Sequence, residues 1–440
     1  MKSAGKYFPW LLLIGLFLGA VWSASAVERF PPPDFDAGYK FPTTTTPAAR
    51  EAWLQIVDVL VLLGALSMST LFVLKKRSRA HILGLTVFSA LYFGFYRKGC
   101  VCSVGSTQDV ALAFFNPGYA VPWTVLAFFL LPLVFTLIFG RTFCAAVCPL
   151  GAMQDLVVVK PKALPVWLEQ GLGIIPFIYL GLGVLLAATG SLFLFCEYDP
   201  FIALYRRSGN WPMLAMGAGF ILVGAFIGRP YCRFLCPYGA MLSVLGRFSK
   251  WNVTLTPQDC VHCQLCDIAC PYGAIKEPVG ELPAPSAAQR KRRLFVVTAL
   301  LPVLVLAGAL IGRQLGTPLS MLHPNVSLAE QIALEDSGKT KQTTKASEAF
   351  RDTGKPKTEL FATALRIRGE FLFGGALLGA FAGLVIGLKL IGLSAVVKRT
   401  IFEPDTANCV ACGRCYTHCP NDLIRIKREQ KAKSIPLTPA

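Results

Sequence analysis

The chain alternates long apolar runs with short polar segments, a pattern typical of helices that cross a bilayer several times. Most runs approach the roughly 20 residues that a membrane-spanning helix requires. The second and fifth runs are shorter, so we expect these two helices to be tilted or broken. The seven runs cover about residues 52–74, 82–97, 121–140, 173–195, 212–228, 294–311 and 371–393. The pattern predicts a polytopic α-helical membrane protein with seven to eight transmembrane helices, the eighth depending on the N-terminus.

The N-terminal segment has two interpretations. Residues 1–26 begin with Lys2 and Lys6, continue through an apolar run and end in Ala24-Ser25-Ala26. This layout is typical of a cleaved signal peptide, and an uncleaved first membrane anchor is the alternative. Residues 27–51 are rich in Pro and Thr, which predicts an extended extracytoplasmic linker.

The basic residues of the chain cluster beside its apolar runs. Only 15% of the 440 residues are charged and the net charge is +18, with basic clusters such as Lys75–Arg79 beside apolar segments. This is the positive-inside pattern, so nucleic acid is not needed to explain the charge. It orients residues 141–172, 229–293 and 398–440 toward the cytoplasm, and residues 98–120, 196–211 and 312–370 outside. The last loop carries many Lys and Arg residues against the rule, but long loops are weak signals of orientation.

Eight of the fifteen cysteines form two copies of one motif. Residues 260–271 read CVHCQLCDIACP and residues 409–420 read CVACGRCYTHCP, both Cys-x2-Cys-x2-Cys-x3-Cys-Pro. This spacing holds a [4Fe–4S] cluster in bacterial ferredoxins. Zinc is the alternative ligand of thiolates, but its sites use separated Cys-x2-Cys pairs. The motifs predict two [4Fe–4S] clusters in a reducing compartment.

The two motifs resemble the two halves of one small α+β ferredoxin domain. In two-cluster ferredoxins the fourth cysteine of each motif binds the cluster of the other motif. We therefore expect Cys260, Cys263, Cys266 and Cys419 to bind one cluster, and Cys409, Cys412, Cys415 and Cys270 to bind the second. A transmembrane hairpin lies between the halves and splits the domain. The predicted organisation is a transmembrane core at 52–250, the two ferredoxin halves at 251–288 and 398–440, and the hairpin at 289–397.

A second repeat lies inside the transmembrane core. FGRTFCAAVCPLGAMQDL at 139–156 recurs as IGRPYCRFLCPYGAMLSV at 227–244, and a degenerate third copy begins at Cys102. Each full copy contains Gly-Arg-x2-Cys-x3-Cys-Pro at the cytoplasmic end of an apolar run. Its cysteines, Cys144, Cys148, Cys232 and Cys236, are candidate soft ligands for one further cluster or for copper, or a dithiol pair. Simple burial of small apolar side chains is the structural alternative.

Three more cysteines, Cys100, Cys102 and Cys196, are expected at outward-facing helix ends. A disulfide between Cys196 and one of the other two is one expectation in an oxidising compartment. A soft-metal or redox centre is the other.

Other cofactor signals are weak. Ser337-Gly338-Lys339-Thr340 contains Gly-Lys-Thr without the preceding glycine of a phosphate-binding loop. No flavin is predicted from this segment, and no haem is predicted because the four histidines are isolated.

Together, the apolar runs, the two Gly-Arg-x2-Cys-x3-Cys-Pro repeats and the two ferredoxin motifs resemble the NosR/NapH family of membrane polyferredoxins. The resemblance covers roughly residues 52–428. It implies electron transfer at the bacterial inner membrane, with partner electron-transfer subunits and a periplasmic reductase or cytochrome. The chain departs from NosR by lacking the large flavin-binding region.

The leading hypothesis is a membrane electron-transfer subunit rather than a stand-alone enzyme, since no acid–base catalytic site is apparent. It would relay electrons between a cytoplasmic donor, or the quinone pool, and a periplasmic system. The hydrocarbon core is about 30 Å thick, so cytoplasmic clusters need a further carrier within the membrane. The alternative is a redox-sensing or metal-centre assembly factor, for example one that reduces copper.

Overall fold

The computed structural model describes residues 51–99, 102–159, 161–162, 164–206, 211–255, 260–278, 287–340, 343–394, 399–425 and 428. The predicted signal peptide or anchor at 1–26 lies outside the described residues. So does the predicted linker, except for its last residue. The described chain is mostly helical.

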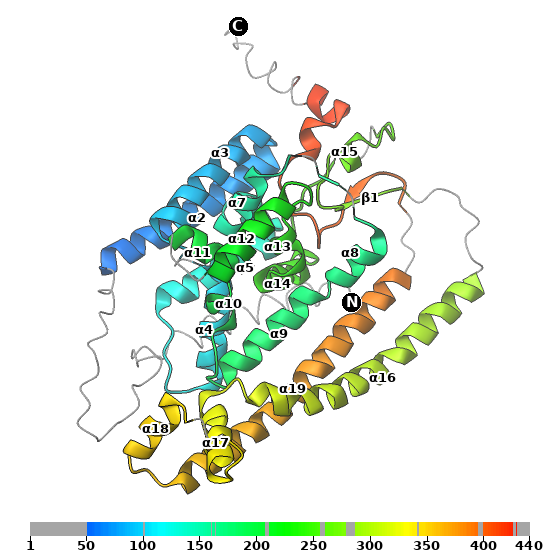
Figure 1. The fold of residues 1–440 in the computed structure, drawn as a ribbon. Coiled ribbons are helices and arrows are strands. Elements are labelled where there is room, and N and C mark those ends of the chain that lie inside the picture. The colour runs from blue at the N-terminus through cyan, green and yellow to red at the C-terminus, as the bar shows by residue number, and fades with distance from the viewer. Residues whose placement is uncertain are drawn as a thin grey trace.

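The core of the molecule is a bundle of helices, several of them short or broken (Figure 1). Its first part consists of two consecutive helices, each of which ends in a π-helical segment. Shorter helices then carry the Cys-Pro segments or join the longer ones. These elements are α2 (Ala52–Thr70), η2 (Leu71–Lys76), α3 (Arg79–Ser89), η3 (Ala90–Tyr96), α4 (Ser103–Phe115), α5 (Trp123–Phe139), α6 (Thr142–Ala146), α7 (Pro149–Leu156), α8 (Val166–Leu172), α9 (Ile175–Ala188), α10 (Leu194–Glu197), α11 (Pro200–Arg206), α12 (Trp211–Gly224), α13 (Pro230–Phe234) and α14 (Pro237–Gly246).

Within the described ranges, four helices are long and apolar enough to cross a membrane: 52–76, 166–188, 291–320 and 357–394. The apolar helices α5 and α12 are shorter. The predicted count of seven to eight spans is therefore not confirmed. Two of the predicted runs, 82–97 and 212–228, coincide with α3–η3 and α12, and the sequence already marked these runs as short. The run expected at 173–195 ends earlier, at Ala188, where the chain turns into α10.

The helical hairpin between the two ferredoxin motifs consists of α16 (Ala287–Ser320) and α19 (Lys357–Ser394). Its helices touch backbone to backbone along two glycine rows, which are Gly308, Gly312 and Gly316 on α16 and Gly375, Gly379 and Gly383 on α19. A Cβ at Gly379 would collide with the carbonyl oxygen of Gly308. Small residues at four-residue spacing allow such close contact between helices in a membrane.

The segment between these helices is largely helical. The expected external loop at 312–370 instead begins with the end of α16. It continues through α17 (Pro324–Asp336) and α18 (Lys345–Asp352) into α19. The helices α17 and α18 lie at one end of the molecule, and α15 (Leu265–Ile268) and β1 (Ile275–Lys276) lie at the opposite end (Figure 1).

The two ferredoxin motifs meet through a short antiparallel sheet. Strand β1 follows the first motif, and β2 (Glu403–Pro404) precedes the second, which ends in the helical turn η4 (Cys415–Thr417). Ile275 pairs with Pro404, and Lys276 pairs with Glu403. The Asp405 N–H also donates to the carbonyl oxygen of Ala274 at 2.7 Å. This pairing agrees with a domain split by the hairpin, which stays a prediction.

Candidate iron–sulfur and thiolate sites

One set of four cysteines gathers from both ferredoxin motifs. Cys260, Cys263 and Cys266 from the first motif line a single cavity together with Cys419 from the second. The loop between the first cysteines turns through two left-handed residues, His262 with φ 54° and Gln264 with φ 61°. Such φ values are uncommon outside glycine. Here they turn the backbone sharply between successive cysteines. The donor set is all sulfur, which fits an iron–sulfur cluster.

The second set gathers in the reciprocal way. Cys270 from the first motif packs with Cys409 and Cys412 from the second. Burial raises the pKa of Cys415, and the nearby Cys412, Cys409 and Cys270 raise it further. Four thiols crowded in this manner resist ionisation by themselves, whereas a bound metal centre deprotonates its thiol ligands. The two groupings have the membership that the sequence predicted, and ligation itself stays a prediction.

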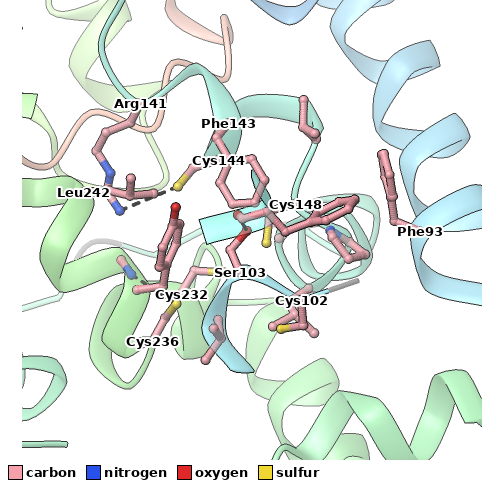
Figure 2. A pocket seen from close by; sticks show the side chains of 18 of the residues that line it. Phe93, Cys102, Ser103, Arg141, Phe143, Cys144, Cys148, Cys232, Cys236 and Leu242 are labelled. Atoms are coloured by element: carbon pink, nitrogen blue, oxygen red, sulfur yellow. Dashed lines mark hydrogen bonds between the residues drawn. The ribbon is translucent and has the colours of Figure 1, made fainter. Parts of the chain in front are cut away.

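The four Cys-x3-Cys-Pro cysteines also share one cavity, inside the helical core (Figure 2). Cys144 lies on α6 and Cys232 on α13, while Cys148 and Cys236 precede α7 and α14. The cavity wall is otherwise mainly apolar, with Phe93, Phe143 and Leu242 among its residues. The structure thus joins the two copies of the repeat at a single site.

The Cys-Pro pairs owe their positions to helix starts. Cys148 and Cys236 are extended N-cap residues, with φ/ψ of −67°/118° and −62°/112°, and the following proline occupies the first helical turn. Proline suits that position because it needs no N–H donor there. The Gly239 N–H donates to the Cys236 sulfur at 3.2 Å. A Cβ would be tightly placed in each copy: at Gly239 it would lie 3.2 Å from the carbonyl oxygen of Cys232, and at Gly151 it would lie 3.3 Å from Nη1 of Arg229.

The degenerate third copy has the same local structure. Cys102 is the extended N-cap residue of α4, and its side chain lines the cavity of the other four cysteines. Cys102 thus stands at a helix end, as the sequence predicted, and this end lies within the core; that it faces outward stays a prediction. At this end the Ser103 hydroxyl donates to the Phe128 carbonyl oxygen of α5 at 2.9 Å.

The predicted disulfide involving Cys196 is not formed with Cys102, because Cys102 keeps a free thiol. Cys100 lies outside the described residues. Cys196 is exposed on α10, and its sulfur would lie 3.1 Å from a Cβ placed on Gly105 of α4.

The thiolate cavity adjoins the second ferredoxin set. Cys144 packs against the same buried cluster of Tyr272, Ala274, Val410 and Cys412 as Cys270 and Cys409 do. Arg141, which also lines the cavity, donates from Nη1 to the carbonyl oxygen of Ala407 at 2.9 Å, and its Nη2 lies 3.9 Å from the Cys144 sulfur. Gly-Arg stands at the same spacing before Cys-x3-Cys-Pro in both repeats. In the first repeat, this spacing lets Arg141 link the thiolate cavity to the second ferredoxin set.

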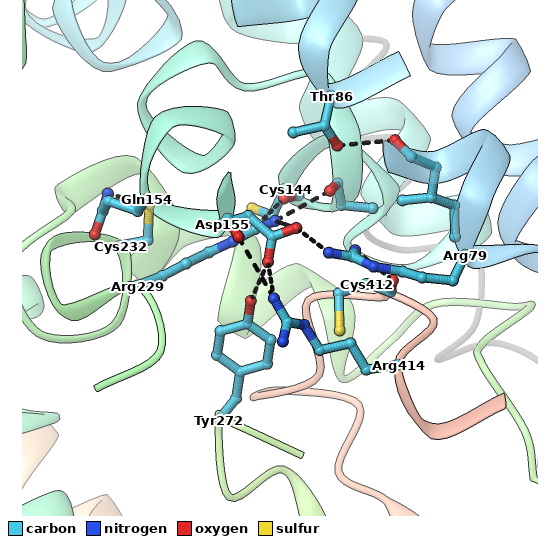
Figure 3. Close-up of polar contacts among 12 residues, drawn as sticks. Arg79, Thr86, Cys144, Gln154, Asp155, Arg229, Cys232, Tyr272, Cys412 and Arg414 are labelled. Carbon is cyan, nitrogen blue, oxygen red and sulfur yellow. Dashed lines mark hydrogen bonds and ion pairs between the residues drawn. The ribbon is translucent and has the colours of Figure 1, made fainter. Parts of the chain in front are cut away.

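The buried carboxylate of Asp155 on α7 binds residues of the helical core and of both ferredoxin motifs (Figure 3). It pairs with Arg79 at 2.5 Å, Arg229 at 3.4 Å and Arg414 at 3.4 Å, and accepts a hydrogen bond from the Tyr272 hydroxyl at 3.1 Å. Burial would raise the pKa of Asp155, but the three guanidinium charges outweigh it and hold that pKa well below its usual range.

The partners of Asp155 come from four segments that are distant in sequence. Arg79 begins α3 and also donates to the Cys412 carbonyl oxygen at 2.9 Å. Arg229 belongs to the second repeat, Tyr272 to the first ferredoxin motif and Arg414 to the second. Sequence reasoning missed this centre. The only signal was the Gly-Arg of each repeat, which places Arg229 but says nothing of its acidic partner.

No three Cys, His, Asp or Glu side chains of the described residues are gathered tightly enough to hold a single metal ion. A cuboidal cluster separates its thiolate ligands more widely, because iron and sulfide lie between them. The all-sulfur donor sets fit an iron–sulfur cluster.

Two family models match the chain, and both are described as 4Fe-4S binding domains. One covers residues 121–167 and 210–256, each stretch containing one Cys-x3-Cys-Pro repeat, and the other covers residues 402–425. The fold and these matches define a mostly helical protein with 4Fe-4S binding domains. No solved structure matches the chain.

Similar proteins point to a narrower family. The protein NirI of Paracoccus denitrificans is 31% identical over 33% of this chain and 23% of its own length. The regulatory protein NosR of Pseudomonas aeruginosa is 27% identical over 54% and 37%. The methylamine utilization ferredoxin-type protein MauN of Methylobacillus flagellatus is 27% identical over 33% and 53%. These similarities support a NosR/NapH-type polyferredoxin-like family and confirm the resemblance found in the motifs.

Proposed function

We propose that the protein relays electrons across the bacterial inner membrane, between a cytoplasmic donor or the quinone pool and a periplasmic reductase or cytochrome. The names of the relatives, which describe ferredoxin-type and regulatory proteins, support an iron–sulfur electron-transfer role. The observation that carries the proposal is that Cys144, from the thiolate cavity, packs against the same buried cluster around Tyr272 and Cys412 as Cys270 and Cys409 of the ferredoxin part. Two sulfur sites that share one cluster of buried side chains form a continuous route from the ferredoxin part into the membrane core.

Three groups of residues would hold the cofactors. Cys260, Cys263, Cys266 and Cys419 would hold one [4Fe–4S] cluster, and Cys270, Cys409, Cys412 and Cys415 a second. A third centre would belong to Cys144, Cys148, Cys232 and Cys236. Such clusters supply one-electron transfer at potentials set by burial and nearby charge. Around them the chain excludes water with aromatic side chains, and the guanidinium groups of Arg79, Arg141 and Arg414 balance the negative charge of the thiolates.

An apolar groove between α2 and α3 supports the quinone pool as a source of electrons. Its lining includes Met68, Phe72 and Leu85. His81 lies at this groove, with Nδ1 2.8 Å from the Ser78 hydroxyl oxygen. On the same helix, Ile82 touches the cluster loop at Gly413. An apolar slot with one polar group next to a redox site suits a lipid-soluble carrier.

The test is the iron and acid-labile sulfide content of the purified full chain, combined with EPR spectroscopy. Eight irons support the two ferredoxin sets and twelve add the thiolate cavity, because each [4Fe–4S] cluster contributes four. Cys148→Ala and Cys236→Ala should each stop electron transfer in reconstituted membranes while both ferredoxin signals remain, with the double variant no worse. Wild-type transfer in both single variants would instead make these cysteines structural.

A second candidate function is redox sensing or assembly of a partner's metal centre. It is motivated by the relative named as a regulatory protein. A sensor would keep its clusters but show no turnover with artificial donors and acceptors on opposite sides of a vesicle. Sustained transmembrane electron flow would exclude sensing alone.

A further inference from the structure

The core contains a second sulfur unit built on the same plan as the thiolate cavity. In the first unit, Gln154 on α7 accepts a hydrogen bond from the Tyr231 N–H at 3.0 Å, and Cys232 follows Tyr231. In the second unit, Gln108 on α4 accepts one from the Phe195 N–H at 2.9 Å, and Cys196 follows Phe195. Gln154 and Gln108 each stand six residues after their N-cap cysteines, Cys148 and Cys102. The pair Cys102 and Cys196 therefore corresponds to the pair Cys148 and Cys232.

The second unit keeps only two of the four sulfurs. Lys98 stands four residues before Cys102, where Cys144 stands before Cys148. Asp199 caps α11, accepting from the N–H groups of Phe201 at 2.8 Å and Ile202 at 3.2 Å, as Cys236 caps α14. The two thiols that the described residues place here are half of the all-sulfur ligand set of a [4Fe–4S] cluster. Two thiols alone are suited to reversible disulfide chemistry.

The two remaining sulfurs lie against the same residue. The Gly105 amide faces the Cys102 thiol, and the Cys196 sulfur lies within contact distance of the Cβ position of Gly105. Cys102 also lines the thiolate cavity, so this pair continues the series of sulfur sites that begins at Cys270.

The pair has one shielded and one accessible member. Cys102 is half-buried in the core, whereas Cys196 is exposed together with the neighbouring Glu197 and Tyr198. A charged neighbour indicates contact with water rather than lipid. The helices α4 and α10 lie on the side of the core toward α17, away from α15 (Figure 1). An accessible thiol at that end can meet a partner that the ferredoxin part cannot reach.

We propose that Cys102 and Cys196 form a redox-active dithiol that passes electrons from the thiolate cavity to a disulfide-containing acceptor on the α17–α18 side. Reduction of the Cys102–Cys196 disulfide takes up two electrons, delivered one at a time by the iron–sulfur sites, and two protons. The Cys196 thiolate then attacks one sulfur of the acceptor disulfide and expels the other. The Cys102 thiolate resolves the mixed disulfide, which reforms the internal bond and leaves the acceptor with two thiols.

The proposal rests on the proposed function for its source of electrons, and trapping of thiols tests it. The purified full chain is oxidised with glutathione disulfide, blocked with N-ethylmaleimide, digested and mapped by mass spectrometry. We expect a peptide pair linked through Cys102 and Cys196. After photochemical one-electron reduction, both residues should instead carry maleimide. In Cys148→Ala, the bridge should form but its photoreduction should be lost.

Matched variants separate the pair from a structural role. Cys102→Ser and Cys196→Ser should each abolish the bridge and the reduction of added glutathione disulfide. In Cys196→Ser, whose site lies outside the thiolate cavity, iron content and both ferredoxin EPR signals should stay at wild-type level. Maleimide on both cysteines after oxidation, or a bridge from Cys196 to Cys100, would overturn the proposal. Absent ferredoxin signals with an intact bridge would count against the proposed function instead.

Discussion

Asp155→Asn removes a buried negative charge at the junction between the membrane core and the second ferredoxin set. The carboxylate is 2% exposed and its partner Arg229 is 1% exposed. The variant leaves a buried guanidinium without its counterion, which typically costs about 3–5 kcal/mol. Asparagine can still accept the Tyr272 hydrogen bond, so we expect the lower end of this range. The loss should concentrate in the loop of Cys409–Cys415, which Arg79 and Arg414 join to Asp155.

Hydrogen–deuterium exchange of the detergent-solubilised chain measures this loss locally. A change of about 3 kcal/mol corresponds to a fall of roughly 10²-fold in amide protection, since about 1.4 kcal/mol is tenfold. The stabilisation follows a lowered carboxyl pKa, so it is complete at neutral pH and decreases only as the pH falls below about 4. Removing a negative charge beside Cys412 should also raise the reduction potential of a cluster held there.

Asp336→Asn is the matched control, because its pairs with Lys357 at 2.8 Å and Arg351 at 3.6 Å are solvent-exposed. Exposed pairs contribute about 0–1 kcal/mol, so protection in α17 should change by less than about fivefold. Asp155→Glu, which keeps the charge, should restore part of the protection. Equal effects of Asp155→Asn and Asp336→Asn, each on its own segment, would refute the argument that burial makes Asp155 decisive.

Three further predictions address the rest of the chain. Cys270→Ser should damage the cluster of the Cys409 loop and spare that of the Cys260 loop, and EPR loss confined to the Cys260 loop would contradict the split domain. Gly379→Ala should force the α16–α19 hairpin apart at a cost of about 1–3 kcal/mol, whereas Gly369→Ala, with open space around its Cβ position, should be neutral or stabilising in thermal unfolding. Reporter fusions after residue 285 and at the C-terminus should report cytoplasm, and those near residue 340 periplasm, while a periplasmic C-terminus would reverse the assigned orientation.

The sequence alone determined the chemistry of the sulfur sets. The spacing of Cys260–Cys270 and Cys409–Cys419 and the repeat of Cys-x3-Cys-Pro predicted which cysteines would gather. These features are readable because ligand spacing, helix-start proline and apolar run length are properties of short, contiguous segments. The family resemblance rested on the same motifs, which is why the comparisons support it.

Only the tertiary structure decided how the segments meet. It placed Cys102 in the cavity of Cys144 and Cys236, and it surrounded Asp155 with arginines from three distant segments. It also formed apolar helices at 123–139 and 211–224 that are shorter than the four long ones. A buried charge is stable only beside its counterions. The end of a helix depends on the segments that pack against it. Both depend on packing between residues far apart in the chain, which no local pattern encodes.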